Sequence, residues 1–411
     1  VTNKNMKQIF DVIIVGGGMT GASLALLLKP AIEQGLKVAL VEAHAASAQQ
    51  VSQPSFDDRT TALSLSTQRI FSKIGVWPNM AGQACAIKHI QVSQQKQLGR
   101  IRLHAQDSQV EAMGYVLENR IMGQQLMSAM LKIPQLTLFA PAQVTSYEVD
   151  AQGAQLTILQ QDQTIELQGD LVVLADGANS EGCRQLGINQ SRHDYGQNAV
   201  VCNVSFDLPH DNWAFERFTM QGPMALLPMT ANRFALVWCM GKEQSQQYLD
   251  MNDDAFQQAL QQALGHKLGR VIRSGERFSY PLSLVVAQEQ IRRHVVVLGN
   301  AAHAMHPVAG QGFNLALRDT QALAKQISEH WPAHSIGSLE VLNRYLSNQI
   351  KDQKITIGLS DGLPKAFTQS GTAWSLLRAM GMSVMDVTPV AKKLFTRQAM
   401  GLVGKAGYWQ P

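Results

Sequence analysis

The stretch that decides the fold is Ile9-Phe10-Asp11-Val12-Ile13-Ile14-Val15 followed by Gly16-Gly17-Gly18-Met19-Thr20-Gly21. The first seven residues are rich in β-branched side chains and predict a strand, which the glycines close. Helix-forming residues continue from Met19 to Lys29, and Lys37 to Glu42 reads as the next strand. This order predicts a βαβ unit whose first turn carries the GxGxxG pattern.

The chemistry of this turn favours a bound dinucleotide. Glycines allow the backbone to approach a pyrophosphate, and the helix that follows offers unpaired N–H groups and the positive end of its dipole. We therefore expect Gly16, Gly18 and Gly21 to form the turn and Glu42 to accept hydrogen bonds from an adenosine ribose. The alternative is a glycine-rich turn of the same shape without a ligand.

The rest of the chain predicts a second sheet inserted into the first unit. Val144 to Gln168 suggests an antiparallel meander, and Leu171 to Ala175 a buried strand. Further strand patterns occur at Val200–Phe206, Phe215–Met220, Phe234–Cys239 and Val295–Leu298, and helical patterns occur at Leu315–Glu329 and beyond residue 335. We expect an α/β fold with a Rossmann-type domain, an inserted antiparallel-sheet domain and C-terminal helices.

Composition excludes several classes of protein. The 411 residues are 16% charged and 45% hydrophobic, which is typical of a folded globular chain. The net charge of +4 is spread along the sequence, so nucleic acid is not an expected partner. Four cysteines without a CxxC pair fit a reducing compartment, and we expect neither a signal peptide nor a membrane-spanning helix. The expected location is the cytoplasm, with peripheral contact at the inner membrane left open.

The first turn alone does not separate NAD from FAD, and a second glycine-rich turn near residue 310 bears on the choice. Leu298-Gly299-Asn300-Ala301-Ala302-His303 follows a predicted strand, and His306-Pro307-Val308-Ala309-Gly310-Gln311-Gly312-Phe313-Asn314 leads into a helix. Backbone N–H groups from Gly310 to Asn314 would stabilise negative charge on a reduced flavin, and the glycines would permit close approach of its ring. A loop that merely caps a helix is the alternative.

Together with Asp176-Gly177-Ala178-Asn179-Ser180, these motifs resemble the group A flavoprotein monooxygenases, the family of p-hydroxybenzoate hydroxylase. Within that family the sequence is similar to the ubiquinone-biosynthesis hydroxylases. The residues that carry this likeness are Asp57–Leu63, Ala214–Phe218, Gly222–Pro228 and His306–Asp319. The resemblance implies an FAD domain from residues 1–75, 100–185 and 281–350, a substrate domain from 76–99 and 186–280, and a helical region from 351–411.

The resemblance also implies roles for individual residues. Arg59, His306, Pro307 and Gly310 are the expected catalytic residues. The expected FAD contacts are Gly16, Gly18, Gly21, Glu42, Arg59, Arg120, Asp176, Gly299, Asn300, Gly310, Gln311, Gly312, Phe313 and Asn314. The expected substrate wall is Phe215, Phe218, Leu226, Pro228 and Trp238, although these apolar residues would serve equally well as ordinary core.

Several of these residues have competing interpretations. Asn300 stands where the family usually has Asp, and Arg184 lies one residue later than the arginine of the family's motif, which puts its role in doubt. Arg59 would hold the flavin or pair with Asp57 or Asp58, and Arg120 would contact FAD or begin a solvated helix. His303 and His306 lack a third ligand at metal-binding spacing, so no metal is expected.

The implied reaction is hydroxylation of an aromatic ring. NADPH or NADH would reduce FAD, O2 would add at flavin C4a, and the resulting hydroperoxide would transfer one oxygen to a polyprenylated phenol such as 2-octaprenyl-6-methoxyphenol. Two alternatives stay open: hydroxylation of a soluble aromatic compound, and a flavin-binding assembly subunit that joins other ubiquinone-synthesis proteins.

The C-terminal stretch from Trp374 to Met400 mixes apolar residues with Arg378, Lys392, Lys393 and Arg397. Such a basic amphipathic segment is typical of contact with an anionic membrane or a partner protein. A core helix with a solvated face is the other interpretation.

Overall fold

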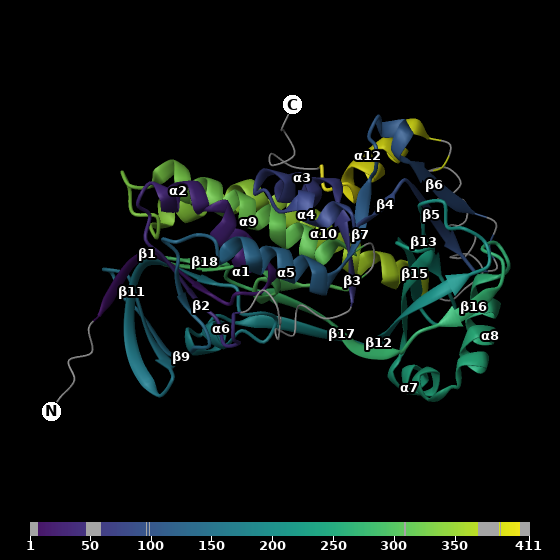
Figure 1. The fold of residues 1–411 in the computed structure, drawn as a ribbon, viewed down its shortest axis with the longest axis horizontal. Helices are drawn as coiled ribbons and strands as arrows, with labels where there is room; N and C mark the ends of the chain where they lie inside the picture. The colour runs from purple at the N-terminus through teal and green to yellow at the C-terminus, as the bar shows by residue number, and fades with distance from the viewer. Residues whose placement is uncertain are drawn as a thin grey trace.

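The computed structural model describes residues 7–46, 59–95, 97, 99–307, 310–368, 386 and 388–402 (Figure 1). Its first elements are β1 (Gln8–Val15), α1 (Met19–Leu27), α2 (Lys29–Glu33) and β2 (Val38–Val41). The predicted strand–turn–helix–strand unit is therefore confirmed. The helical run does not stop at Pro30, because that proline lies in the first turn of α2, where its missing N–H costs nothing.

Eight strands of the described chain form the sheet that carries this unit. Their order along the main path is β18–β19–β11–β1–β2–β8, with β10 on β11 and β9 on β10. The further strands are β8 (Thr137–Phe139), β9 (Gln143–Val149), β10 (Ala154–Gln160), β11 (Gln163–Leu174), β18 (Ile291–Arg292) and β19 (Val295–Val297). The predicted meander and buried strand prove to share β11, which pairs antiparallel with β10 at its start and parallel with β1 toward its end.

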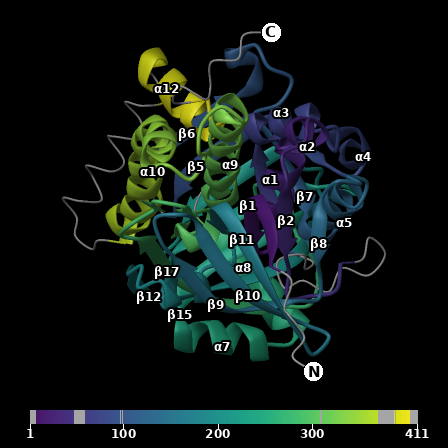
Figure 2. The same ribbon diagram turned by 90° about the vertical axis from the view of Figure 1, so that its left-hand side faces the viewer.

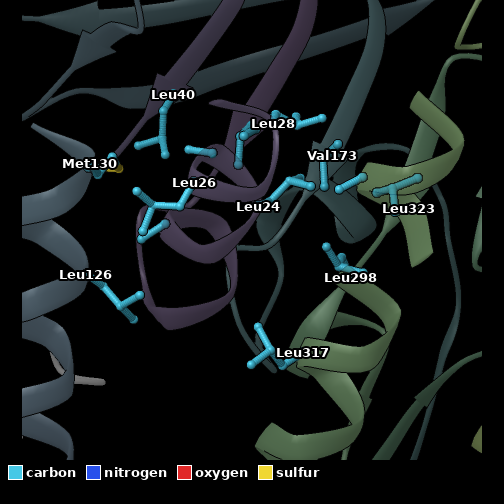
Figure 3. Close-up of a cluster of buried hydrophobic side chains, with 14 of the residues drawn as sticks. Leu24, Leu26, Leu28, Leu40, Leu126, Met130, Val173, Leu298, Leu317 and Leu323 are labelled. Carbon is cyan, nitrogen blue, oxygen red and sulfur yellow. The ribbon is translucent and has the colours of Figure 1, made fainter. Parts of the chain in front are cut away.

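One face of this sheet is covered by α1, α5 (Asn119–Met130) and α9 (Gln311–His330). Figure 3 shows leucines from α1 and α9 meeting Leu40 of β2 and Val173 of β11, with Leu126 and Met130 of α5 beside them. On the other face, β9, β10 and β11 close a second apolar cluster around Ile13. The glycine turn after β1 is thus mounted on an element that is buried on both faces.

A second sheet of nine described strands lies beside the first (Figure 1). Its main path is β20–β17–β12–β15–β14–β13–β5–β6, with β16 on β12. The bounds are β5 (His89–Gln94), β6 (Arg100–His104), β12 (Gln190–Phe206), β13 (Trp213–Phe218), β14 (Pro223–Met229), β15 (Arg233–Gly241), β16 (Val271–Ser274), β17 (Phe278–Ala287) and β20 (His303–Ala304). Two helices, α7 (Lys242–Asp250) and α8 (Asp253–Leu264), pack against one face through Tyr248 and Phe256.

Strand pairing crosses two of the expected domain boundaries. β6 begins at residue 100 but pairs with β5, and β17 spans residue 281 within the second sheet. Sheet membership does not by itself divide a chain into domains, so the boundaries stay a prediction.

A small sheet of β3 (Thr60–Ser64), β7 (Gly114–Glu118) and β4 (Cys85–Ile87) lies between these units. The other elements are α3 (Leu65–Lys73), α4 (Trp77–Ala81), η1 (Ala105–Ser108), α6 (Glu181–Gln185), η2 (Gly299–Ala301), α10 (Leu339–Thr368) and α12 (Pro389–Ala399). In Figure 2, α10 and α12 lie on the same side of the molecule, next to α9. The fully buried pair of Arg318 on α9 and Asp352 on α10, with Nε 2.6 Å from Oδ2, joins these two helices.

Candidate functional site

The turn after β1 has the geometry that only glycine permits. Gly16 has φ of +102°, and a Cβ at this position would lie 2.5 Å from the carbonyl oxygen of Ala175. A Cβ on Gly21 would lie 1.9 Å from the carbonyl oxygen of Gly16. The first helix therefore packs directly on the turn, and Gly18 stands as the N-cap of α1.

Glu42 follows β2 and its carboxylate is tied to this turn. Its Oε2 accepts from the Gly17 N–H at 2.7 Å, and its Oε1 accepts from the His44 N–H at 2.8 Å. Oε1 also lies 2.9 Å from His44 Nδ1, so the second lone pair of Oε2 is the acceptor site that remains. Glu42 is thus positioned beside the turn as the sequence predicts, with acceptor capacity left for a hydroxyl group.

A large cavity of about 1180 Å³ opens at this turn. Among the predicted site residues, Gly16, Gly18, Glu42, Arg59, Asp176, Asn300, Pro307 and Phe313 line it. The volume exceeds the roughly 300–1,000 Å³ of ordinary small-molecule sites and suits a large cofactor.

Asp176 brings a carboxyl group into this cavity from the end of β11. Its Oδ2 accepts from the Gly182 N–H at 3.1 Å, whereas its buried Oδ1 has no hydrogen-bond partner among the described atoms. Burial raises the pKa of Asp176, against the lowering effect of hydrogen bonds from Ser180 and Gly182. An orphaned buried acceptor is costly unless a ligand donor meets it.

The arginine that meets the Asp176 segment is Arg192 of β12, which sequence reasoning missed. Its guanidinium donates to Asn179 Oδ1 at 3.0 Å and to the carbonyl oxygen of Ala178. Arg184 instead pairs with Glu181 on the exposed surface of α6. The arginine that contacts this segment therefore comes from β12, outside the motif, and no local sequence pattern reveals it.

The second glycine turn leads into α9 by a left-handed cap. Gly310 has φ of +59°, and Gly299 has φ of +67°. Gly310 is the N-cap of α9, which explains why the helix begins at Gln311 and not at Leu315 as the pattern predicts. A Cβ on Gly312 would meet no atom within 4 Å, so this position faces open space.

The side-chain amide of Asn314 bonds to protein groups around the start of α9, and its contact with FAD stays a prediction. Its Oδ1 accepts from Ser64 N–H at 2.8 Å and from Thr67 Oγ1 at 2.7 Å. Its Nδ2 donates to the carbonyl oxygens of Ala62 at 2.8 Å and Gly310 at 2.6 Å. The amide is fully used in tying β3 to the start of α9, so it positions this turn.

The two predicted arginines differ in placement. Arg59 lines the large cavity, and its guanidinium carbon lies 4.6 Å from the ring centroid of Tyr280. Asp57 and Asp58, the ion-pair partners that the alternative interpretation gives to Arg59, lie outside the described residues. Arg120 is half-exposed, with Nη2 3.4 Å from Glu118 Oε2, and its neighbour Asn119 lines the cavity in its place.

A second cavity of about 500 Å³ adjoins the first. The residues that line both are Thr60, Thr61, Val237, Met305, Pro307 and Phe313. Gly310, Gln311, Gly312 and Asn314 at the start of α9 line the second cavity on the same side. The start of α9 therefore stands where the two cavities meet.

Strand register determines which side chains form the wall of the second cavity. Ala225 of β14 lies opposite Glu216 of β13 and Val237 of β15, and these residues share a face with Phe218 and Leu227. Successive side chains on a strand alternate between faces. Among the predicted wall residues, Phe218 belongs to this face.

The other predicted wall residues lie in the alternate phase. Leu226 and Trp238 are fully buried in the core beneath α7 and α8, and Phe215 packs in that same cluster while touching the cavity edge. Pro228 is buried and is not among the described residues that line either cavity. Side chains along β13 and β14 alternate between the cavity and the core. The positions of the aromatic residues do not by themselves show which alternate set faces the cavity.

Two titratable side chains among the described residues line this predominantly apolar cavity, Glu216 and His306. Sequence reasoning missed Glu216, which stands among aromatic residues in β13. Burial lowers the pKa of His306 to about 4, so its imidazole is neutral at physiological pH. The edge of Tyr195 packs against His306 with centroids 5.1 Å apart, and Tyr195 Oη donates to Asp361 of α10 at 2.9 Å.

His303 lies apart from His306, in a buried pair with Asp319 at 2.7 Å. Within the described residues, no cluster of three His, Cys, Asp or Glu side chains has metal-binding geometry. Likewise, none of the helices in the described part of the chain combines the length and apolarity needed to cross a membrane.

These features fit an FAD cofactor in the large cavity. The turn at Gly16 can cradle a pyrophosphate, Glu42 and the orphaned Asp176 Oδ1 offer acceptors for hydroxyl groups, and α9 directs its N-terminus to the junction. The flavin end would then face the second cavity across Pro307 and Phe313.

Solved structures share this fold. p-Nitrophenol 4-monooxygenase from Pseudomonas putida superposes with a TM-score of 0.77 at 16% identity, covering 97% of this chain and 100% of that chain. PqsL from Pseudomonas aeruginosa, solved with 2-aminobenzoylacetate, has a TM-score of 0.74 at 19% identity, with 91% and 100% covered. These likenesses confirm the predicted p-hydroxybenzoate hydroxylase-like architecture.

Sequence relatives identify the family. The FAD binding domain model matches residues 10–345. Ubiquinone hydroxylase UbiL of Rhodospirillum rubrum is 34% identical over 398 residues, covering 96% of this chain and 90% of that protein. The 3-demethoxyubiquinol 3-hydroxylase of Escherichia coli is 28% identical over 411 residues, covering 96% and 99%. The chain therefore belongs to the family of FAD-binding monooxygenases.

Proposed function

We propose that this protein hydroxylates the ring of a polyprenylated phenol in ubiquinone biosynthesis, with 2-octaprenyl-6-methoxyphenol as substrate and NADPH or NADH as reductant. The observation that carries the proposal is the apolar cavity beside the cofactor cavity. Relatives named as ubiquinone hydroxylases support the pathway. When bound, FAD supplies the redox chemistry with O2, and the chain supplies binding, orientation and exclusion of water.

The second cavity is suited to a neutral, apolar aromatic ring. Ile90, Val92, Phe218, Ala225 and Leu227 provide an apolar wall, and no lysine or arginine is among its described lining residues. A soluble aromatic acid would need a cationic partner for its carboxylate. The described lining therefore favours the prenylated phenol over a soluble aromatic acid.

Glu216 and His306 are the candidate acceptors for the phenol proton. An electron-rich ring reacts better once its hydroxyl group is deprotonated, and a general base must lie within hydrogen-bond reach of that proton. A neutral imidazole can accept it, and so can a carboxylate. Pro307 lies at the junction of the cavities, so a ring held against it would have one edge toward the cofactor.

The test is to supply the purified, FAD-loaded chain with NADPH or NADH, O2 and the prenylated phenol, and to identify the product by mass spectrometry. The expected product is one oxygen atom heavier, and NAD(P)H oxidation depends on the phenol. The matched comparison is a phenol that carries a carboxylate in place of the prenyl tail. Preferential turnover of the carboxylated compound would overturn the substrate assignment.

A strain that lacks the gene separates an enzyme from an assembly subunit. Gly310→Val should abolish rescue of ubiquinone synthesis, because the left-handed cap of α9 does not accommodate a β-branched residue. Full rescue by a variant that no longer holds FAD would favour the assembly role. The intermediate that accumulates in the deletion strain identifies the ring position.

A further inference from the structure

Helix α12 has two different faces, and the outer one has no partner among the described residues. Its inner side carries Phe395 and Ala399, which line the apolar cavity. On its outer side, Val390 is 71% exposed and Leu394 is 63% exposed. Exposed apolar residues at this spacing on one helix are typical of an interaction surface.

Basic residues complete this outer stripe. Lys393 and Arg397 are exposed and stand with Val390 and Leu394 at positions i, i+3, i+4 and i+7, which share one helix face. The helix sequence PVAKKLFTRQA contains no acidic residue. The stripe is therefore both apolar and positively charged, a combination that complements an anionic lipid surface.

The helix is fixed to the folded part of the chain, so the stripe has a defined direction. The Met400 carbonyl oxygen at its end accepts from the Ser66 N–H at 3.1 Å. Gln398 donates to Thr356 of α10 at 3.2 Å. Lys392 forms an ion pair with Asp386, with Nζ 3.4 Å from Oδ1. The same oxygen of Asp386 accepts from the Arg102 N–H of β6.

The neighbouring helix α10 repeats the pattern. Lys351, Lys354, Ile355 and Leu359 are exposed on it, while Leu363 lines the apolar cavity. Of its acidic residues, Asp352 is buried against Arg318, Asp361 pairs with Lys365 at 2.7 Å, and the exposed Glu340 pairs with Arg344 at 2.8 Å. In Figure 2 the two helices lie together on one side of the molecule.

We propose that the outer stripe of α12, formed by Val390, Lys393, Leu394 and Arg397, docks on an anionic lipid bilayer. The helix then has the bilayer on its outer side and the apolar cavity on its inner side. A lipid-tailed phenol would pass between them with little exposure to water. This inference deepens the proposed function and rests on it, because bilayer binding serves the enzyme only if its substrate is held in the bilayer.

The experiment is co-sedimentation of the FAD-loaded full chain with vesicles of phosphatidylcholine, with or without phosphatidylglycerol. We expect binding to the anionic vesicles that weakens as salt is raised. Leu394→Ser should reduce vesicle affinity at least about tenfold, and Lys393→Glu should do the same through charge. Ile272→Ser is the matched control, because Ile272 of β16 is 58% exposed on the other sheet unit and should leave binding unchanged.

Three outcomes overturn the docking proposal: no binding to either vesicle, equal binding to both, or wild-type binding by Leu394→Ser and Lys393→Glu. The flavin absorbance of each variant verifies that it is folded and loaded. Hydroxylation of a short-tailed phenol in detergent tests the proposed function separately, since Leu394 does not line the described cavity. Wild-type turnover in detergent with lost vesicle binding is the expected result for Leu394→Ser.

Discussion

At the scale of single residues, Gly21 marks a close approach of two backbone segments in the turn that we expect to hold the pyrophosphate. A glycine-to-alanine change inside a helix normally stabilises a protein by about 0.5–1 kcal/mol. At Gly21 the added Cβ would lie 1.9 Å from the Gly16 carbonyl oxygen, so the turn must move and the sign reverses.

We therefore expect Gly21→Ala to lose most of its FAD, measured as the ratio of flavin to protein absorbance after purification. Gly82→Ala is the control, because a Cβ at that position meets nothing within 4 Å. Retention of full flavin content by Gly21→Ala would contradict the assignment of this turn to the pyrophosphate.

His306 makes a prediction about pH. Its pKa is about 4 in the folded protein and near 6.5 when exposed, so the unfolded state binds more protons between these values. The free energy of unfolding should then fall by about 2 kcal/mol from this residue alone as pH drops from about 7 to about 5. Urea unfolding at both pH values should show a smaller fall in His306→Gln, and an unchanged fall would argue that this histidine is not the buried neutral group.

At the scale of elements, strand β14 places adjacent leucines on opposite sides of the second sheet. Leu227 faces the apolar cavity, and Leu226 is fully buried beneath α7 and α8. Leu226→Ala should lower the free energy of unfolding by about 2–5 kcal/mol and leave the KM for the phenol nearly unchanged.

Leu227→Ala should do the reverse, with a raised KM and a smaller loss of stability. Denaturant unfolding and steady-state kinetics on the two variants distinguish the faces. The assignment of the cavity wall would be wrong if Leu226→Ala changed KM more than Leu227→Ala did.

The sequence predicts some elements of the fold, but it does not predict which face of a strand lines the site. β1, the glycine turn and α1 follow from the order of β-branched residues, glycines and helix formers, because these preferences act between neighbours. Phe215, Leu226 and Trp238 have the right composition for a substrate wall, but their face depends on pairing between β13, β14 and β15. Arg192 meets Ala178 through a fold that brings residues 14 positions apart together, and no local pattern encodes that contact.

At the scale of the whole molecule, the sequence motifs proved to converge from three regions. The turn at Gly16, the carboxyl group of Asp176 and Pro307 before α9 all line the large cavity. They meet at the carboxyl end of the first sheet, where parallel strands bring such residues together. The role of Trp374 to Met385 in the C-terminal stretch stays a prediction, because these residues lie outside the described part of the chain.

The shared wall of the two cavities has a thermodynamic consequence. Thr60, Thr61, Met305, Pro307 and Phe313 belong to both, so ordering them for one ligand prepares them for the other. Linkage then requires reciprocity: the factor by which FAD tightens binding of the phenol equals the factor by which the phenol tightens binding of FAD. Calorimetric titration of each ligand in the absence and presence of the other should return one positive coupling constant, about five-fold or more, from either direction.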